Sequence, residues 1–250
     1  PAWNHHAGVA SFADTDEVND AVSARYGVPA DMRDFCGHAQ VLGYEAWRAM
    51  FEAYGRNYPR GTGVIGWRLN SAWPSVFWQL YDYYLQPNGA YYGTQKACEP
   101  LHLQYSYDDA SIWALNMTLK PATGLTARVA VVEPNGSVRG EQSLDFSLNA
   151  QTRRRLMVLP DFAGTSPVYF VFLRLLQDGR GVTRNVYWLA EKPDVFEPEN
   201  RKKFYWPLRR HADMSALRGL PAADLSVEVC RRDDPADRRV EVLLRNRSDH

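Results

Sequence analysis

Apolar residues near the start of the chain recur at the spacing of amphipathic helices. Acidic residues at 14–17 suit the first turn of a short helix, which we expect to run to Tyr26 and to stop at Gly27. A longer helix is predicted over 31–54, because its apolar residues recur at steps of three and four and so share one face. These residues are Phe35, Ala39, Leu42, Ala46, Met50 and Ala53. Gly55 is the expected end of this second helix.

The pattern changes to a short continuous apolar run at 63–67. The run Gly-Val-Ile-Gly-Trp suits a strand that is buried on both faces, as in a parallel sheet covered by helices. Polar residues follow at once, with Arg68 and Asn70 just after the predicted strand. A helix, a loop, a buried strand and polar side chains at its carboxyl end are typical of an α/β barrel. A further helix is predicted over 93–98.

From Glu99 onward the pattern is that of an all-β protein. Seven strand-like segments recur at roughly ten-residue spacing, separated by turn sequences such as Asp178-Gly179, and together they predict a β-sandwich. They lie at 101–107, 111–118, 126–133, 138–147, 152–159, 167–177 and 181–189. The Pro-rich and charged stretch that follows lacks periodicity and is predicted to be a linker. Strands at 225–230 and 239–245 then predict the start of a second sandwich. The fold class expected is therefore α/β followed by all-β.

Composition excludes several classes of protein. The 250 residues carry 29 basic and 29 acidic side chains, and this balance argues against a nucleic-acid-binding protein. No apolar run approaches the roughly 20 residues of a membrane-spanning helix. Cys36, Cys98 and Cys230 are far apart and have no metal-binding spacing, so we expect neither a metal site nor a cofactor. The disulfide state of these cysteines stays open.

Both ends of the chain are unusual. The first residue is Pro1 rather than Met, and the strand predicted at 239–245 stops just before the end. A strand needs a partner for its backbone hydrogen bonds. We therefore expect a fragment of a longer protein, cut at both ends.

Several motifs together resemble a known enzyme family. They are Gly-Val-Ile-Gly-Trp-Arg-Leu-Asn-Ser-Ala-Trp-Pro-Ser at 63–75, Leu-Tyr-Asp-Tyr-Tyr-Leu at 80–85, Glu-Pro-Leu-His-Leu-Gln-Tyr-Ser-Tyr-Asp-Asp at 99–109 and Arg-Asn-Val-Tyr-Trp-Leu at 184–189. This set is similar to the end of the catalytic barrel and the following immunoglobulin-like domain of glycoside hydrolase family 2. Within the family, the chain resembles the exo-β-D-glucosaminidases, with the β-mannosidases and mannosylglycoprotein endo-β-mannosidases close by.

The resemblance implies a domain organisation. Residues 1–98 would be the C-terminal portion of a (β/α)8 TIM barrel, 99–190 an immunoglobulin-like sandwich, 191–223 a linker and 224–250 the start of a further sandwich. The missing N-terminal domains of the same polypeptide would be the chain's partner, and the family expectation is an extracellular or periplasmic location. An aromatic seam between barrel and sandwich is expected at Trp78, Tyr81, Tyr83 and Tyr84.

The same resemblance implies a retaining glycosidase, which uses two carboxyl groups on the sugar. In this family both carboxyl groups lie on earlier barrel strands. Glu45 and Glu52 lie on the predicted second helix and Glu99 begins the sandwich, so none of them is at the end of a barrel strand. We assign no catalytic residue within the chain, and we expect the chain alone to be inactive.

Four residues are candidates for substrate binding. Trp67, at the carboxyl end of the predicted barrel strand, could form the floor under a sugar ring, or it could be a core residue. Asn70 could hydrogen-bond a sugar hydroxyl or amine, or it could cap its loop. Trp73 could line the pocket or pack beneath the loop. His5 could face the site with His6, or the two could be solvated.

The function expected from the resemblance is therefore exo-β-D-glucosaminidase activity on chitosan oligosaccharides, to which this chain would contribute one wall of the sugar pocket. The alternative within the family is a β-mannosidase or a mannosylglycoprotein endo-β-mannosidase. The alternative of another class is a non-catalytic carbohydrate-binding sandwich protein. The helix at 31–54 followed by a strand at 63–67 argues against that last class, because such a protein would not need a helix–strand element.

Overall fold

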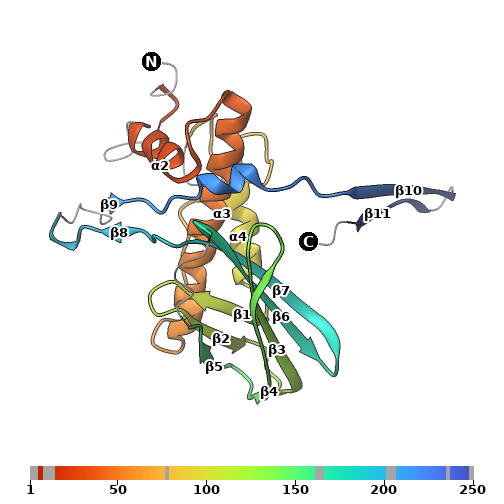
Figure 1. The fold of residues 1–250 in the computed structure, drawn as a ribbon. Helices are drawn as coiled ribbons and strands as arrows, with labels where there is room; N and C mark the ends of the chain where they lie inside the picture. Colours follow the sequence, from red (N-terminus) through yellow and green to blue (C-terminus); the bar gives the residue numbers. More distant parts are fainter. Residues whose placement is uncertain are drawn as a thin grey trace.

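The computed structural model describes residues 5–7, 15–76, 79–160, 166–200, 207–234 and 237–247. It is mostly β-sheet with few helices, and its central feature is the long helix α3 (Met32–Asn57), which stands on one side of a β-sandwich (Figure 1). Two shorter helices, α2 (Asp16–Tyr26) and α4 (Gly89–Ala97), pack against α3.

Local chemistry explains where α3 begins and ends. Asp31 precedes the helix in an extended conformation, and its side chain accepts a hydrogen bond from the Asp34 backbone N–H at 2.9 Å. The helix does not stop at Gly55, as predicted, but continues to Asn57, shortly before Pro59. A Cβ atom on Gly55 would lie 2.6 Å from Leu115 Cδ2. This glycine therefore allows close packing of α3 on the sandwich rather than ending the helix.

Helix α4 begins four residues earlier than predicted. Asn88 caps it, because its side chain accepts a hydrogen bond from the Tyr91 backbone N–H at 3.1 Å. Gly89 and Gly93 weaken the helix pattern in the sequence. In the structure they lie directly against the backbone carbonyl groups of Gln40 and Tyr44 of α3, where a Cβ atom would clash. The two helices can therefore approach closely only through these glycines.

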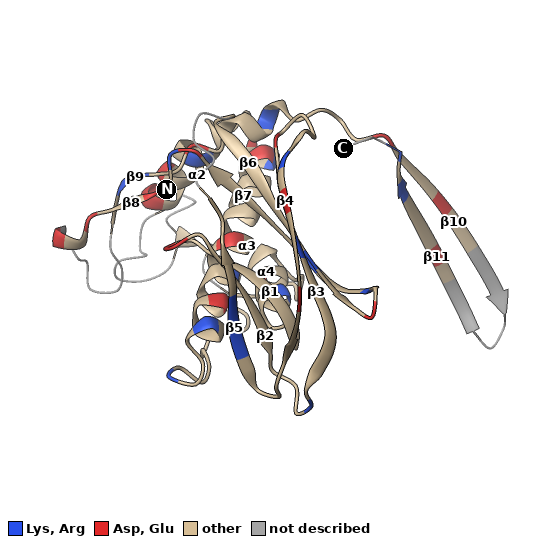
Figure 2. Cartoon of the chain, turned by 60° about the horizontal axis from the view of Figure 1, so that its bottom comes forward, with Lys and Arg blue, Asp and Glu red and all other residues tan. Residues whose placement is uncertain are grey.

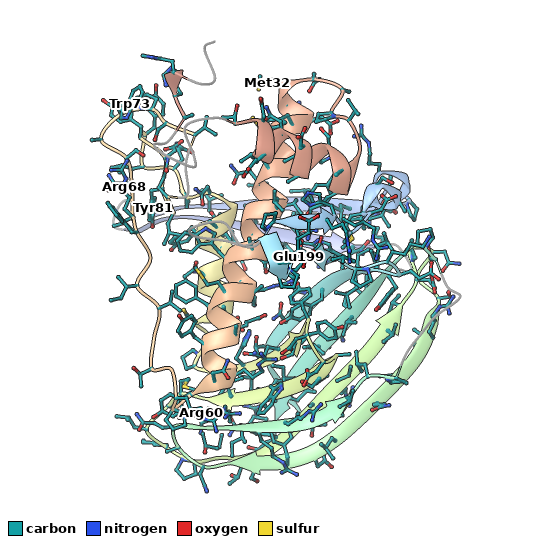
Figure 3. The ribbon with its side chains drawn as sticks, turned by 90° about the vertical axis from the view of Figure 1, so that its left-hand side faces the viewer. Met32, Arg60, Arg68, Trp73, Tyr81 and Glu199 are labelled. Carbon is teal, nitrogen blue, oxygen red and sulfur yellow. The ribbon has the colours of Figure 1, made fainter. Side chains whose placement is uncertain are left out.

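The strand predicted at 63–67 is wrong for this structure. The segment is irregular, and it runs along the outside of α3 (Figure 3). Ile65 is 99% exposed and Trp67 is 76% exposed. An apolar run becomes a buried strand only where neighbouring strands accept its hydrogen bonds, and the described part of the chain places no strand beside this one.

All seven strands predicted between 101 and 189 are present and form two antiparallel sheets. The first sheet has the order β1-β2-β5 and consists of β1 (Leu101–Ser106), β2 (Ser111–Asn116) and β5 (Thr152–Val158). The second has the order β4-β3-β6-β7 and consists of β3 (Ala122–Val132), β4 (Val138–Leu148), β6 (Val168–Gln177) and β7 (Arg180–Ala190). Their inner faces enclose one core, which includes Leu103, Ile112, Leu125, Val129, Val171, Leu173 and Tyr187.

Alternation and turn chemistry explain this sandwich. In β3, Val129 and Val131 point into the core while Arg128 is exposed, which is the period-two pattern of a half-buried strand. The two residues between β6 and β7, Asp178 and Gly179, both have positive φ angles, 50° and 78°. Such a pair suits the two-residue turn that matches the twist of a hairpin.

The stretch after β7 is folded back on the helices. Strands β8 (Val195–Phe196) and β9 (Leu208–Arg210) pair with each other. One 3-10 turn, η2 (Pro198–Asn200), lies between them in the sequence, and another, η3 (Ser215–Gly219), comes after β9. Ala212 and Met214 share a buried apolar cluster with Tyr26 of α2. The predicted linker is therefore packed against the helical part of the molecule at that point.

The last two strands, β10 (Leu225–Asp234) and β11 (Asp237–Asn246), form a hairpin that projects from the body of the molecule (Figure 1). One face of it carries apolar side chains that are 53–64% exposed. They are Leu225, Val227, Val229, Val240, Val242 and Leu244. This is the period-two pattern of a strand pair with one face suited to burial.

Candidate functional site

The structure places three of the four predicted substrate-binding residues on one irregular segment that follows α3. Trp67 is 76% exposed and Trp73 is 41% exposed, while Asn70 lies between them and is also exposed. Within this chain, Trp67 is thus a surface residue rather than a core residue. The Asn70 side chain makes no hydrogen bond to the described residues, so these offer no support for a loop-capping role.

His5 and Trp73 meet, although they are far apart in the sequence. The His5 ring lies edge-on to the Trp73 indole with a centroid distance of 5.6 Å. The His6 ring stacks on the same indole at 5.2 Å, and His6 Nδ1 lies 2.6 Å from the carbonyl oxygen of Pro74. The Val76 backbone N–H also donates to the His6 carbonyl oxygen at 2.7 Å. These contacts make one surface of two imidazoles and an indole.

Polar contacts shape the loop that carries this surface. The backbone N–H groups of Leu80 and Tyr81 both donate to the Leu69 carbonyl oxygen, at 3.0 and 2.9 Å. Ser71 and Ser75 share a hydroxyl–hydroxyl hydrogen bond of 2.8 Å. Trp73 therefore lies at the tip of a closed loop, at the edge of the molecule in Figure 3. The loop is held by its own backbone and hydroxyl groups and by its contacts with His5 and His6.

Trp67 is placed by its neighbour Gly66. A Cβ atom on Gly66 would lie 3.0 Å from Trp47 Cζ3 and 3.2 Å from Trp47 Cη2. The backbone next to Trp67 therefore rests against the indole of Trp47, which stacks on Phe51 one turn further along α3. The peptide bond between Trp67 and Arg68 is cis.

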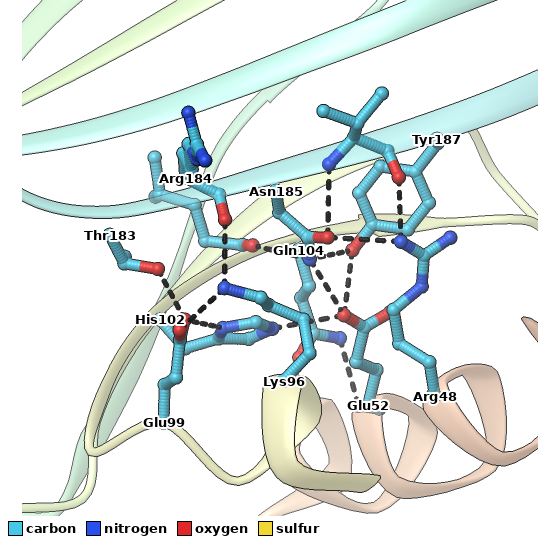
Figure 4. Close-up of polar contacts among 12 residues, drawn as sticks. Arg48, Glu52, Lys96, Glu99, His102, Gln104, Thr183, Arg184, Asn185 and Tyr187 are labelled. Carbon is cyan, nitrogen blue, oxygen red and sulfur yellow. Dashed lines mark hydrogen bonds and ion pairs between the residues drawn. The ribbon is translucent and has the colours of Figure 1, made fainter. Parts of the chain in front are cut away.

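The carboxylates of Glu52 and Glu99 lie in a different place, in a cluster that we call the polar seam (Figure 4). It joins α3 and the end of α4 to strands β1 and β7. Its members are Arg48, Glu52, Lys96, Glu99, His102, Gln104, Thr183, Asn185 and Tyr187. Sequence reasoning missed this cluster and expected an aromatic seam instead.

Glu52 is the centre of the polar seam. Its Oε1 accepts hydrogen bonds from the Tyr187 hydroxyl at 2.7 Å and from Asn185 Nδ2 at 3.0 Å, and it lies 2.9 Å from His102 Nε2. The Glu52 side chain is only 2% exposed. A buried carboxylate with three polar partners is a structural anchor, and it has no open space in which to meet a substrate.

Arg48 supplies the positive charge next to Glu52 and is fully buried. Its Nη1 donates to Asn185 Oδ1 at 3.0 Å and to the Val186 carbonyl oxygen at 2.6 Å. The guanidinium also lies over the Tyr187 ring, with its Cζ 4.0 Å from the ring centroid. Hydrogen bonds and an aromatic face together replace the water that this charge loses on burial.

His102 and Glu99 complete the seam. The two imidazole nitrogens of His102 lie between two carboxylates, Glu52 on one side and Glu99 Oε2 at 3.3 Å on the other. Burial alone would lower the pKa of His102, but its hydrogen bonds with Glu52 and Glu99 outweigh burial and raise it. Burial alone would raise the pKa of Glu99, but hydrogen bonds from His102 and Lys96 lower it to about 2. The directions of these two pKa shifts both favour a protonated His102 between the carboxylates of Glu52 and Glu99.

Glu45 continues the ionic contacts toward the end of β7. It accepts a hydrogen bond from the Tyr107 hydroxyl at 3.4 Å and pairs with Arg25 at 3.5 Å. Arg25 in turn donates to both carboxylate oxygens of Asp194, at 2.6 and 2.8 Å. Burial raises the pKa of Glu45, which is 6% exposed. These contacts tie α2 and α3 to the segment that follows the sandwich.

The aromatic seam expected between barrel and sandwich is not formed by its described members. Tyr83 is 45% exposed and Tyr84 is 71% exposed, whereas Tyr81 packs on Tyr91 of α4 with a centroid distance of 5.1 Å. Trp78 lies outside the described residues. A signal for the polar seam was present in the sequence, because charged residues at 45, 48 and 52 share one face of the predicted helix.

Metal ligands, membrane-spanning helices and cysteines are the other features that could define a site in this chain. The described residues contain no group of three or more His, Cys, Asp or Glu side chains that could hold a metal ion. Among the helices that the structure describes, none has the length and apolarity needed to cross a membrane. Cys36, Cys98 and Cys230 are free and exposed. Trp67 and Trp73 present exposed aromatic faces of the kind on which sugar rings stack.

Comparison with known proteins gives the class of the chain. No family model matches it. The exo-β-D-glucosaminidase of Streptomyces avermitilis is 38% identical over 234 residues, which are 90% of this chain and 26% of that enzyme. The mannosylglycoprotein endo-β-mannosidase of Lilium longiflorum is 28% identical over 195 residues, which are 76% of this chain and 20% of that enzyme. The chain is therefore related to glycoside hydrolases.

Solved structures give a more particular match. The exo-chitosanase of Amycolatopsis orientalis superimposes with a TM-score of 0.90 and 34% identity, covering 97% of this chain and 30% of that one. A β-D-mannosidase from Dictyoglomus thermophilum shares the fold with a TM-score of 0.62 over 73% of this chain and 24% of that one. The predicted resemblance to the exo-β-D-glucosaminidase branch of glycoside hydrolase family 2 is thus confirmed. The chain spans about a quarter of the length of the curated relatives it matches.

Proposed function

We propose that the chain is the C-terminal part of a retaining exo-β-D-glucosaminidase that acts on chitosan oligosaccharides. The observation that carries this proposal is the match over 97% of the chain to an exo-chitosanase at 34% identity. Complexes of that enzyme with PNP-β-D-glucosamine give the same TM-score of 0.90. A match at this level to an enzyme that binds a glucosamine substrate favours glucosamine as the sugar.

The proposal assigns a role to each part of the chain. Residues 1–98 are the end of a (β/α)8 barrel, 99–190 an immunoglobulin-like sandwich, 191–223 a linker and 224–250 the start of a further sandwich. The three-plus-four strand arrangement of 101–190 supports the second assignment. On this view, 63–67 forms a barrel strand when the preceding strands of the same polypeptide pair with it. The location proposed is extracellular or periplasmic, as expected for an enzyme that degrades a polysaccharide.

The chain contributes binding rather than bond cleavage. In a retaining glycosidase, two carboxyl groups roughly 5–5.5 Å apart act as acid/base and nucleophile, and we assign both to the rest of the polypeptide. Trp67 forms the floor under the sugar ring, Asn70 hydrogen-bonds a hydroxyl or amine group, and Trp73 with His5 forms one wall. The contact between His5 and Trp73 and the exposure of Trp67 support these roles.

Product analysis tests the proposal. The whole polypeptide is incubated with a reduced chitosan oligosaccharide, and the products are followed over time. We expect free glucosamine from the first time point and oligosaccharides shortened by one sugar at a time, while the 250-residue chain alone releases nothing. Internal cleavage products, or no cleavage by a folded whole polypeptide, would contradict the proposal.

A β-mannosidase is the second candidate. Its support is the match to a mannosylglycoprotein endo-β-mannosidase at 28% identity, which is weaker than the match to the exo-β-D-glucosaminidases. The fold and the roles of the aromatic residues would be the same in both cases. The two candidates differ in the sugar that the whole polypeptide releases, and an endo-β-mannosidase would differ also by cleaving inside its substrate.

A further inference from the structure

Helix α3 contacts its neighbours along several of its sides. Arg48 and Glu52 are one turn apart and face the sandwich through the polar seam. The backbone at Gln40 and Tyr44 receives the glycines of α4. Trp47 contacts the segment that carries Trp67. A single rigid helix therefore connects the sandwich to the proposed sugar-binding residues.

The Gly66 backbone packs closely on Trp47. A Cβ atom on Gly66 would lie 3.0–3.2 Å from the indole ring, so the ring or the backbone would have to shift by a few tenths of an ångström to admit one. The ring also stacks on Phe51 of the same helix, with a centroid distance of 6.1 Å and an interplanar angle of 22°. The Gly66 backbone thus lies against an aromatic ring that packs on its own helix, and glycine permits this approach without a shift.

The segment around Gly66 has few other anchors. Among the described residues, backbone hydrogen bonds hold the chain at Gly61 and again at Leu69, but none holds residues 62–68. On either side of Gly66, the Ile65 side chain is almost fully exposed and the Trp67 side chain is largely exposed. Within this chain, the position of the Trp67 backbone therefore depends on the Trp47 contact more than on the hydrogen bonds of its own segment. In the whole polypeptide, pairing of 63–67 as a barrel strand adds to that contact, which still sets the distance of the strand from α3.

The other side of α3 is held firmly. Tyr187 and Asn185 of β7 donate hydrogen bonds to Glu52, and Arg48 donates to Asn185 and to the backbone of β7. A helix fixed in this way cannot slide or rotate without breaking buried polar contacts, and such breaks are costly. The indole of Trp47 therefore has a defined place relative to the sandwich.

We infer that Trp47 is a positioning residue for substrate binding: through Gly66 it sets the place at which Trp67 meets the sugar. This inference rests on the proposed function, in which Trp67 is the floor of the pocket. Trp47 itself does not touch the sugar. The sandwich thereby acquires a role in binding, because its hydrogen bonds to Arg48 and Glu52 hold the helix that carries Trp47.

Kinetics of the whole enzyme on a chromogenic β-D-glucosaminide test the inference. We expect Trp47→Ala to raise KM about tenfold with kcat changed less than about twofold, and Trp47→Phe to raise KM less, because a phenyl ring keeps part of the contact. The control is Val129→Ala, which removes buried volume from the sandwich core away from α3. It should lower stability and leave KM unchanged. A normal KM for both Trp47 variants would overturn the inference.

A double-mutant cycle gives a second test that does not depend on Trp47→Ala being folded. Gly66→Ala should raise KM because its methyl group meets the indole, and Trp47→Phe in the same protein should recover part of the loss by making room. Contacting residues show such non-additive effects, whereas independent residues do not. If the double variant raised KM by the product of the two single-variant factors, the residues would act independently and the inference would be overturned.

The variant Trp67→Ala, measured alongside, separates this inference from the proposed function. A raised KM for Trp67→Ala with normal KM values for the Trp47 and Gly66 variants would contradict the positioning role alone. An unchanged KM for Trp67→Ala would contradict the binding role of Trp67, and the positioning role would fall with it. Raised KM values for all three, with the recovery described above, would support both.

Discussion

Arg48 is a fully buried cation in the polar seam. Its guanidinium lies over two tyrosine rings, with Cζ 4.0 Å from the centroid of Tyr187 and 5.1 Å from that of Tyr44. Three hydrogen bonds fix its plane, to Asn185, to the Val186 carbonyl and to Tyr107. A side chain with a planar fork of donors and a flat face suits this site, and the point charge of lysine does not.

The variant Arg48→Met tests what this cation contributes to stability. It removes a buried positive charge near the Glu52 carboxylate together with the donors to Asn185 and the Val186 carbonyl oxygen, and we expect the free energy of unfolding to fall by about 3–5 kcal/mol. Urea unfolding monitored by circular dichroism measures the change. The matched control is Arg128→Met on an exposed position of β3, for which a change within about 0.5 kcal/mol is expected. Similar midpoints for the two variants would show that the seam adds little to stability.

Glycine at position 93 gives a second prediction at this scale. Gly93→Ala places a methyl group against the Tyr44 backbone, which cannot move aside, and a loss of about 1–3 kcal/mol in the free energy of unfolding is expected. Gly37→Ala, in the first turns of α3, is the control, because nothing lies within 4 Å of its Cβ position. It should raise stability by about 0.5–1 kcal/mol through helix propensity. Equal effects of the two substitutions on the thermal midpoint would contradict the close packing of α4 on α3.

Sequence reasoning succeeded at residues whose role is local and failed at those whose role is set by a distant partner. The caps and periodicity of α3 are local, so its start was predicted to within a residue. Gly55 was wrongly expected to end α3 and Gly93 to begin α4, because each permits the approach of an element that the local pattern does not contain. The contact of His5 with Trp73 is of the same kind. Nothing near either residue in the sequence indicates the other.

At the scale of elements, the joint between α3, α4 and β1 should respond to pH. The raised pKa of His102 means that its contribution to stability is fully present below about pH 6.5, its ordinary pKa, and is lost as the pH rises through the raised value. The lowered pKa of Glu99 means that its contribution is present above about pH 4.5 and is lost as the pH falls toward 2. We therefore expect the thermal midpoint of the chain to be highest between about pH 4.5 and 6.5.

His102→Gln is the variant that tests the source of this dependence. Glutamine keeps a hydrogen bond to Glu52 and carries no charge at any pH, so the alkaline loss of stability should become smaller. His38→Gln on α3 lies outside the polar seam and serves as the control. Differential scanning calorimetry across the pH range measures both. An alkaline loss that is the same in His102→Gln and in the unsubstituted chain would place its source elsewhere.

The arrangement of elements also predicts where a protease can act. Arg60 is exposed at the start of a segment whose residues 62–68 have no backbone hydrogen bonds to the described residues, while Arg48 and Arg56 lie within α3. Among the sites at 15–76, trypsin should cut first after Arg60 or Arg68, which lie beside and within that segment. The polar seam should then hold the two pieces together in native gel filtration. Early cleavage within α3, or separation of the pieces without denaturant, would contradict the anchoring role of the seam.

Most of the element order could be predicted from the sequence. The seven strands of 101–190 were recognised from alternation and turn residues, since each strand has its partners within the chain. The strand expected at 63–67 has no such partner among the described residues, and its apolar side chains are exposed instead. The polar seam was missed because charged residues on a helix are usually solvated, and only the fold brings Asn185 and Tyr187 to Glu52.

At the scale of the whole molecule, the proposed function predicts that other domains of the same polypeptide cover two apolar surfaces of this chain. One is the face of the β10–β11 hairpin with Val227, Val242 and Leu244, and the other is the segment with Ile65 and Trp67. In the view of Figure 2, acidic and basic residues alternate along the described chain, apart from a basic run on β5. Such surfaces fit the remaining domains of one long polypeptide better than a charged polymer. The chain's share of about a quarter of its relatives agrees with this view.

The most direct test is a comparison of two substrates on the whole polypeptide. Matched chromogenic β-D-glucosaminide and β-D-mannoside would be assayed under the same conditions, and kcat/KM would be determined for each. The proposed function predicts a clear preference for the glucosaminide, with activity reduced by Trp67→Ala. A preference for the mannoside would move the protein to the mannosidase branch while keeping its fold. Release of neither sugar by a folded whole polypeptide would contradict the assignment to a glycosidase.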